Sequence, residues 1–195
     1  GSTSGLNIAI DTLVDEGTHV IAARNCHKSV HSMLDRKNVN VHYIYPEIDP
    51  VFHNDSHIDS EKLFNMIEEL KHRGIDNISA VILTCPNYFG RSFPLKGISG
   101  YLEAKNIYLI IDEAHGAHFE FSSDLPEGAV SQGATISVQS AHKTLPALTQ
   151  VSMLHLGNNF PDSRMEILKK NISFYQTSSP SYIFMASCEA AVSIM

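Results

Sequence analysis

The chain has 195 residues, of which 43% are hydrophobic and 18% are charged, and its formal net charge is -7. These values are typical of one folded domain and argue against broad electrostatic capture of nucleic acid or of anionic membranes. No apolar run approaches the roughly 20 residues that a membrane-spanning helix needs. The three cysteines form no C-x-x-C pair, which indicates reduced thiols in a cytoplasmic protein and not a disulfide framework or a zinc site.

The two ends of the sequence suggest a piece of a longer protein. The chain starts at Gly1 without a methionine or a signal-peptide pattern, and it stops inside a helical pattern. No internal repeat and no Gly/Ser-rich linker divides it. We therefore expect residues 1–195 to form one domain that is truncated at both ends.

The first predicted element is a helix over residues 6–17, opened by a small-residue loop, GSTSG, at residues 1–5. Free backbone N–H groups and hydroxyls at a helix N-terminus suit a phosphate, because the donors and the helix dipole point the same way. An ordinary Ser/Thr cap would explain the same residues. The segment is not a P-loop, since no Gly-Lys-Ser/Thr follows, nor a G-x-S-x-G nucleophile elbow, since Thr3 holds the serine position.

Strand-like runs rich in Val, Ile and Leu alternate with helical patterns along the rest of the chain. The clearest helix is predicted over 59–74, with Asp59 or Ser60 as N-cap and Gly74 as the stop, and a shorter helix over 97–106. Several strand runs are almost continuously apolar, as expected of parallel strands covered on both faces. The alternation predicts an α/β layer architecture with a largely parallel sheet. The six runs are 19–23, 41–45, 80–85, 107–112, 135–140 and 151–156.

A carboxylate ends the fourth of these runs. Asp112 follows an apolar strand, where an ionised carboxylate demands a cationic or hydrogen-bonding partner. Ligands of open α/β sheets bind at this carboxyl end of the strands. The letters D-E-A-H also occur in helicase ATPases, but the chain has neither a P-loop lysine nor basic character. His115 and His118 could be metal ligands, although a surface or hydrogen-bonded role fits their spacing better.

A lysine follows the fifth run. Lys143 stands directly after a histidine in the otherwise uncharged segment SVQSAHKTLPALTQ (137–150). An amine among apolar groups can act as a nucleophile toward aldehydes, although an isolated surface lysine would look the same. His27 follows the first run in ARNCHKSV and would by itself more often be structural than catalytic. These side chains share their placement just after strands.

The segment around Lys143 resembles the cofactor-attachment segment of the bacterial ornithine/lysine/arginine decarboxylases, which are fold type I pyridoxal-phosphate enzymes. The likeness rests on a Ser-x-His-Lys run followed by a Leu-Thr-Gln tail. GSTSG, RNCHKSV, DEAHGAH and QTSSPSY match further family segments in the same order. The resemblance covers the whole chain as the large cofactor-binding domain, without the family's smaller C-terminal domain. It implies a three-layer α/β/α fold with a mostly parallel, mixed sheet.

The resemblance also implies a role for each matching residue. Lys143 would hold pyridoxal 5'-phosphate as an internal aldimine, and Asp112 would pair with its pyridine nitrogen. His27 would stack on one face of the ring, Ala114 would pack opposite, and His115 would belong to the same cofactor site. The phosphate would be held by Ser2, Thr3, Ser4, Ser140 and His142.

The activity implied by the resemblance is decarboxylation of a basic amino acid, arginine, lysine or ornithine, to carbon dioxide and a polyamine-type amine. A proton must afterwards return to Cα, from Lys143 or from His27. The family context implies a homodimer or a higher homo-oligomer with the site at the subunit boundary. QTSSPSY (176–182) would contribute to the partner's site, unless its hydroxyls form a local helix cap. We expect no metal and no nucleic-acid or membrane partner.

Two other functions stay open from the sequence. The same domain could serve another fold type I reaction, such as that of an aminotransferase, a lyase or a desulfurase, because fold does not fix function. It could also form part of a non-catalytic assembly or regulatory protein. The sequence departs from the family pattern at Cys85 and Asn87, which leaves the contacts to the cofactor's ring hydroxyl open. A second departure is Pro146, which interrupts the tail after Lys143.

Overall fold

A six-stranded sheet forms the centre of the molecule, and the computed structural model describes all 195 residues. The strands are β1 His19–Ala23, β2 Asn40–Ile44, β3 Ile78–Thr84, β4 Tyr108–Asp112, β5 Ile136–Gln139 and β6 Met153–Leu156. Their order in the sheet is β2-β1-β3-β4-β5-β6. The first five strands pair in parallel, and β6 pairs antiparallel with β5. The prediction of a mostly parallel, mixed sheet is therefore confirmed.

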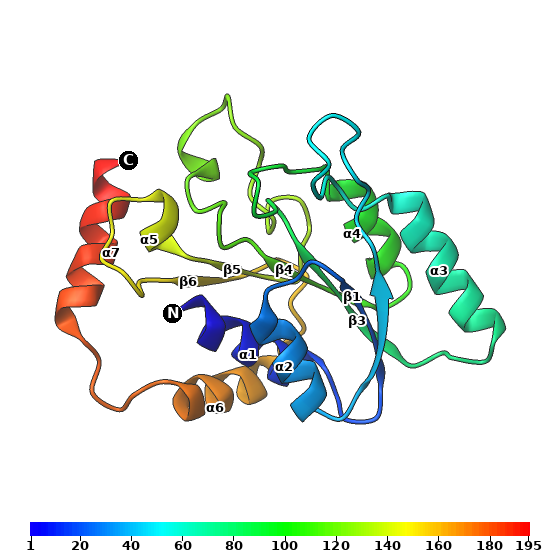
Figure 1. The fold of residues 1–195 in the computed structure, drawn as a ribbon. Coiled ribbons are helices and arrows are strands. Elements are labelled where there is room, and N and C mark those ends of the chain that lie inside the picture. The colour runs from blue at the N-terminus through cyan, green and yellow to red at the C-terminus, as the bar shows by residue number, and fades with distance from the viewer.

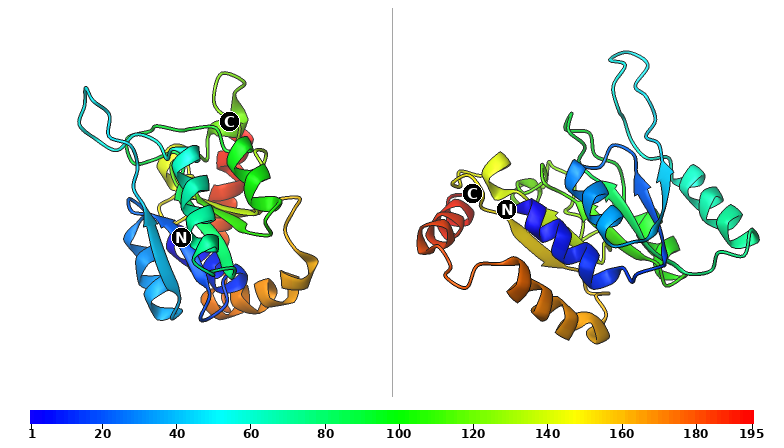
Figure 2. Two further views of the ribbon diagram at one scale, coloured as in Figure 1. Left: turned by 90° about the vertical axis from the view of Figure 1, so that its right-hand side faces the viewer. Right: turned by 60° about the horizontal axis from the view of Figure 1, so that its bottom comes forward.

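Helices cover both faces of this sheet and complete the predicted three-layer α/β/α arrangement (Figure 1). One layer holds α1, α2 and α6, with α1 packed against each of the other two, and the other layer holds α3 and α4 (Figures 1 and 2). None of the helices has the length and apolarity required to span a bilayer. The helices are α1 Ser2–Leu13, α2 Lys28–Arg36, α3 Ser60–His72, α4 Lys96–Glu103, α5 Ala141–Thr144, α6 Met165–Tyr175 and α7 Tyr182–Ile194, with short 3-10 turns at Phe119–Phe121 and Asp162–Arg164.

The helix predicted most clearly from the sequence, α3, has the expected caps. The Asp59 carboxylate accepts the backbone N–H groups of Glu61 and Lys62, at 2.8 and 3.3 Å. Gly74 follows the helix with a φ of 81°, a left-handed conformation that glycine adopts at low cost. Its apolar face is buried against the sheet and the neighbouring helix through Leu63, Ile67 and Leu70, with Met66 partly covered.

The start of α1 differs from the prediction. The segment GSTSG is not a loop, because the helix begins at Ser2 and Gly1 is its N-cap. Small side chains let this first turn lie directly on the sheet: a Cβ added at Gly5 would meet Cγ1 of Val138 at 2.7 Å. The close approach to β5 explains why a glycine stands at position 5.

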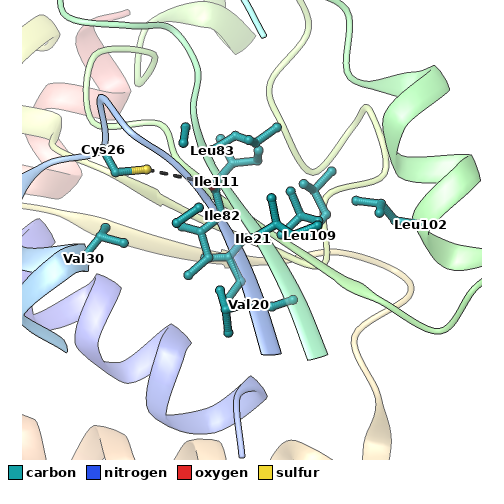
Figure 3. Close-up of a cluster of buried hydrophobic side chains, with 14 of the residues drawn as sticks. Val20, Ile21, Cys26, Val30, Ile82, Leu83, Leu102, Leu109 and Ile111 are labelled. Carbon is teal, nitrogen blue, oxygen red and sulfur yellow. Dashed lines mark hydrogen bonds between the residues drawn. The ribbon is translucent and has the colours of Figure 1, made fainter. Parts of the chain in front are cut away.

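The core lies on both sides of the central strands (Figure 3). Burial is nearly complete along β1, β3 and β4, which accounts for their continuous apolar sequence. The thiol of Cys26 lies 3.6 Å from the Ile82 carbonyl oxygen, and burial raises its pKa to about 12. All three cysteines are free, and this one stays protonated and unreactive. The labelled side chains of this cluster are Val20, Ile21, Cys26, Val30, Ile82, Leu83, Leu102, Leu109 and Ile111.

Because the five parallel strands point the same way, their carboxyl ends lie along one edge of the sheet. The loops that follow β1, β3, β4 and β5 begin at this edge. The segments that begin there carry His27, residues 85–91, His115 and, in α5, Lys143. The topology thus gathers the chemically interesting residues in one region.

Candidate active site

Lys143 lies in α5, a single helical turn that follows β5 directly. Its side chain is exposed, and its Nζ lies 3.1 Å from Nε2 of His115. His115 comes from the turn after β4, so two adjacent parallel strands deliver the two groups. Burial, and secondarily the charge of Lys143, lowers the pKa of His115. The imidazole is therefore neutral at pH 7 and accepts a hydrogen bond from the lysine amine group.

Asp112 is the last residue of β4 and is only 3% exposed. Its Oδ1 accepts the Ala114 N–H at 3.2 Å. Burial raises the pKa of Asp112, while that N–H, Lys143 and His27 act in the opposite direction. His27 follows β1, Asp112 ends β4 and Lys143 follows β5, so all three stand at the carboxyl edge of the sheet. A cation placed beside this carboxylate would stabilise its ionised form.

His27 lies at the start of α2, where it is the N-cap residue. Its Nδ1 accepts the Ser29 N–H at 3.2 Å and lies 2.8 Å from the Ser29 hydroxyl. The rest of the exposed imidazole lines a hollow of about 380 Å³ together with Thr3 of α1. The ring is thus held by one edge while the remainder stays open to a ligand.

The first turn of α1 is suited to an anion. It carries Ser2, Thr3 and Ser4, has no side-chain cap, and contains no acidic residue. A Cβ added at Gly1 would lie 3.3 Å from the Gln150 carbonyl oxygen, so the turn borders the loop after α5 as well as β5. Its free N–H groups and the helix dipole favour negative charge at this place.

The residue that follows β5 has a hydroxyl group without a hydrogen-bond partner. Ser140, between β5 and α5, is fully buried, and its Oγ has no hydrogen-bond partner. A buried donor without a partner costs roughly 1–3 kcal/mol, so an acceptor oxygen of a ligand would stabilise it. His142 is half-buried, and its Nδ1 lies 2.9 Å from the Val151 carbonyl oxygen. Its other ring nitrogen is the one that a ligand could use.

We predict that Gly5→Ala lowers the free energy of unfolding by about 1–3 kcal/mol, because its methyl group would overlap Val138. Adding Val138→Ala should recover part of this loss, so that the double variant is more stable than the sum of the single effects predicts. Gly97→Ala in α4 is the matched control, since a Cβ there meets nothing within 4 Å. Urea unfolding of the parent protein, the three single variants and the double variant measures these changes. Equal losses at both glycines would contradict the close packing of α1 on β5.

Asn87, whose contacts to the cofactor's ring hydroxyl the sequence left open, holds the loop after β3 together. Its side chain is 2% exposed and makes four hydrogen bonds to backbone groups. It has no free group for a cofactor hydroxyl. The partners are the carbonyl oxygens of Asp55 and Ser56, at 2.8 Å each, and the N–H groups of Phe89 and Arg91, at 3.0 Å each. Cys85 is also buried, with its thiol 3.7 Å from the Phe93 carbonyl oxygen.

Two residues that the sequence analysis did not single out belong to this region. Tyr88 is 80% exposed, and its ring stands edge-on to that of His115, with centroids 5.9 Å apart. Glu113 is buried, and its two carboxylate oxygens accept the Ala129 N–H at 2.8 Å and the Gln139 amide at 2.9 Å. Glu113 could have been found from the sequence, because it stands directly after Asp112 in the letters D-E-A-H. Tyr88 could have been found from its place just after a predicted strand.

Other expected features have ordinary structural roles. His118 packs against Phe119, and no group of three or more His, Cys, Asp and Glu side chains could hold a metal ion. Pro146 is exposed and lies beyond Leu145, the C-cap of α5. The interruption of the tail therefore leaves the turn of Lys143 intact.

Comparison with known families decides what kind of domain this is. The sequence model for the major domain of the Orn/Lys/Arg decarboxylases matches residues 1–195. The chain belongs to the Orn/Lys/Arg decarboxylase family. A Bacillus subtilis relative, described as uncharacterized protein YaaO, is 35% identical over 191 residues, which are 98% of this chain and 38% of the relative. An arginine decarboxylase of Halalkalibacterium halodurans is 29% identical over 191 residues, with the same two coverages.

Solved structures show the same fold as this decarboxylase-family domain. Lysine decarboxylase A from Pseudomonas aeruginosa superposes with a TM-score of 0.84 at 21% identity, over 100% of this chain and 28% of that one. A PLP-dependent aminotransferase from Streptococcus suis superposes with a TM-score of 0.76 at 16% identity, over 98% of this chain and 48% of that one. The fold is therefore that of the fold type I enzymes that depend on pyridoxal phosphate. The chain spans about two fifths of the length of the curated relatives it matches.

Proposed function

We propose that the protein decarboxylates a basic amino acid with pyridoxal 5'-phosphate as its cofactor, and that residues 1–195 form its large cofactor-binding domain. The observation that carries this proposal is the position of Lys143, Asp112 and His27 at the carboxyl ends of three strands of one sheet, β5, β4 and β1. Membership of the decarboxylase family supports the reaction class. When bound, the cofactor supplies an aldehyde for amines and a protonated ring that accepts the electron pair left at Cα.

The residues present fit this cofactor. The exposed amine of Lys143 would bind the aldehyde carbon, and the buried carboxylate of Asp112 would pair with the ring nitrogen. The open imidazole of His27 would cover one ring face, with Ala114 on the other, and His115 would border the same site. The Ser140 hydroxyl has no hydrogen-bond partner in the protein, and a phosphate would provide an acceptor oxygen for it. The other phosphate ligands would be Ser2, Thr3, Ser4 and His142.

The chain's own groups would then divide the work of catalysis. Asp112 would keep a positive charge on the ring nitrogen, because an unpaired carboxylate at this buried position is costly. His27 would hold the cofactor ring from one face and so fix its orientation in the site. Nζ of Lys143, or the imidazole of His27, would deliver the proton that replaces carbon dioxide at Cα.

The family and the net charge support the proposed substrate class. Curated relatives of this chain are named arginine and lysine decarboxylases, and the net charge of -7 suits cationic substrates. We propose arginine, lysine or ornithine as the substrate, and carbon dioxide and a polyamine-type amine as the products. Three free thiols support a place in the cytoplasm.

We also propose that the protein works as a homodimer or a higher homo-oligomer. The support is α7, whose large apolar side chains Tyr182, Ile183 and Met185 are all more than half exposed. An apolar helix face of this kind is typical of a surface that another subunit covers. Within QTSSPSY, the Ser181 hydroxyl accepts the Phe184 N–H at 3.4 Å and caps α7. The remaining hydroxyls of this segment are the ones that could reach a partner's site.

The test of the proposed reaction is a substrate panel with the full-length protein and added pyridoxal phosphate. Arginine, lysine and ornithine are each supplied, and carbon dioxide and the amine product are measured, with alanine and glutamate as control substrates. We expect gas and amine in equal amounts from at least one basic amino acid and none from the controls. Transfer of the amino group without gas would indicate an aminotransferase instead, and no reaction of any of the three would contradict the proposal.

A further inference from the structure

The side chain of Lys143 needs a restraint. It is exposed and joined to the backbone by four rotatable bonds, so by itself it would sample many positions in solvent. Its contact with Nε2 of His115, at 3.1 Å, holds the amine at the carboxyl edge of the sheet. Lys143 is also the charged group that acts on His115. The two side chains therefore form a pair that faces the site.

His115 is itself held in place by its neighbours. The following residue is Gly116, where a Cβ would lie 2.7 Å from Cγ of Glu113 and 3.0 Å from Cδ of Pro86. The turn after β4 thus packs closely on the loop after β3. That loop, fixed by Asn87, presents Tyr88 edge-on to the imidazole of His115 at 5.9 Å. The turn that carries His115 is therefore closely packed, and the imidazole itself has an aromatic neighbour in Tyr88.

We propose that His115 is a positioning residue for Lys143: its Nε2 holds the lysine amine at the site whenever that amine carries no cofactor, and Tyr88 supports the imidazole from the open side. The contact itself does not depend on the proposed function, but its purpose rests on Lys143 being the attachment residue. Restraint of a nucleophile raises the rate of bond formation, because fewer of its conformers are unproductive. The expected consequence is faster capture of an aldehyde by Lys143.

The first arm of the test needs no cofactor. In the full-length apoprotein, exchange of the imidazole C2 hydrogen for deuterium, followed by mass spectrometry, gives the pKa of His115. Lys143→Met should raise that pKa, because a neighbouring positive charge and a hydrogen-bond donor to the neutral ring are both removed. Lys28→Met, at the exposed start of α2, is the matched control and should leave it unchanged. An unchanged pKa in Lys143→Met would overturn the inference.

The second arm measures the rate at which the apoprotein captures pyridoxal phosphate, followed by the visible absorbance of the lysine-linked form. His115→Phe should slow capture by about tenfold, whereas His115→Gln, which keeps an acceptor, should stay within about threefold of the parent protein. Tyr88→Ala should also slow capture, and Tyr88→Phe should not, because Phe keeps the ring that stands against the imidazole. His72→Gln on the exposed side of α3 controls for loss of a histidine.

The two arms separate failure of this inference from failure of the proposed function. Capture by His115→Phe at the rate of the parent protein would overturn the positioning role. If the parent protein captures no pyridoxal phosphate at all, the proposed function fails, and the exchange experiment still decides whether His115 and Lys143 are paired.

Discussion

Lys143→Ala is expected to abolish the visible absorbance of the lysine-linked cofactor and to lower kcat by at least about a thousandfold. The substitution removes the amine that would bind the aldehyde and one of the two groups that could return the proton to Cα. Its effect on folding should be small, because the side chain is exposed and its contact is a single hydrogen bond to His115. Absorbance spectra and steady-state rates measured on the full-length protein give both quantities.

Lys170→Ala is the matched control for this variant. Lys170 is also exposed and also lies on a helix, α6. This helix follows the antiparallel strand β6, so it begins at the opposite edge of the sheet. It should keep the spectrum and the rate of the parent protein. A Lys143→Ala protein that retains the same lysine-linked absorbance would show that another lysine carries the cofactor.

Asp112→Asn is expected to lower kcat by about 10²–10³ while making the apoprotein no less stable, and even more stable at pH 7. The amide has the shape of the carboxylate but no charge, so it cannot hold a positive charge on the ring nitrogen. The pKa of Asp112 is raised in the folded protein, mainly by burial. Its ionisation therefore opposes folding, and the stability that the protonated acid contributes is lost as the pH rises above its unfolded pKa near 4.

The pH dependence separates this account from a purely structural role of Asp112. The stability difference between the parent apoprotein and Asp112→Asn should be large at pH 7 and should shrink as the pH falls toward 4. Thermal unfolding of the apoproteins across this range, together with kcat at pH 7, measures both predictions. Asp76→Asn, at an exposed position, should change neither quantity. A less stable Asp112→Asn apoprotein at pH 7 would indicate that the carboxylate serves the fold.

The sequence predicted the fold well because hydrophobic periodicity and strand direction carry most of that information. All six strands lie within two residues of the predicted bounds, and α3 has the caps that Asp59 and Gly74 indicated. The error at GSTSG has a physical cause. Serine and glycine favour loops by intrinsic preference, and the packing of Gly5 on Val138 overrides that preference.

The site was predictable in outline and not in detail. Asp112 and Lys143 stand at strand ends, and parallel strands place such ends together, so their meeting follows from topology. The contact between His115 and Lys143 depends on two loop conformations, which periodicity does not specify. The internal bonding of Asn87 likewise depends on a loop 32 residues away in the chain. Loop-to-loop contacts of this kind appear only in the three-dimensional structure.

Reduction with borohydride tests the central claim most directly, because it converts a lysine-linked pyridoxal group into a stable pyridoxyl-lysine. The full-length protein is loaded with pyridoxal phosphate, reduced, digested and sequenced by mass spectrometry. The account predicts that the pyridoxyl group sits on Lys143, in the peptide that contains Ser140 and His142. Modification of a different lysine, such as Lys96 or Lys170, with Lys143 left unmodified, would contradict it.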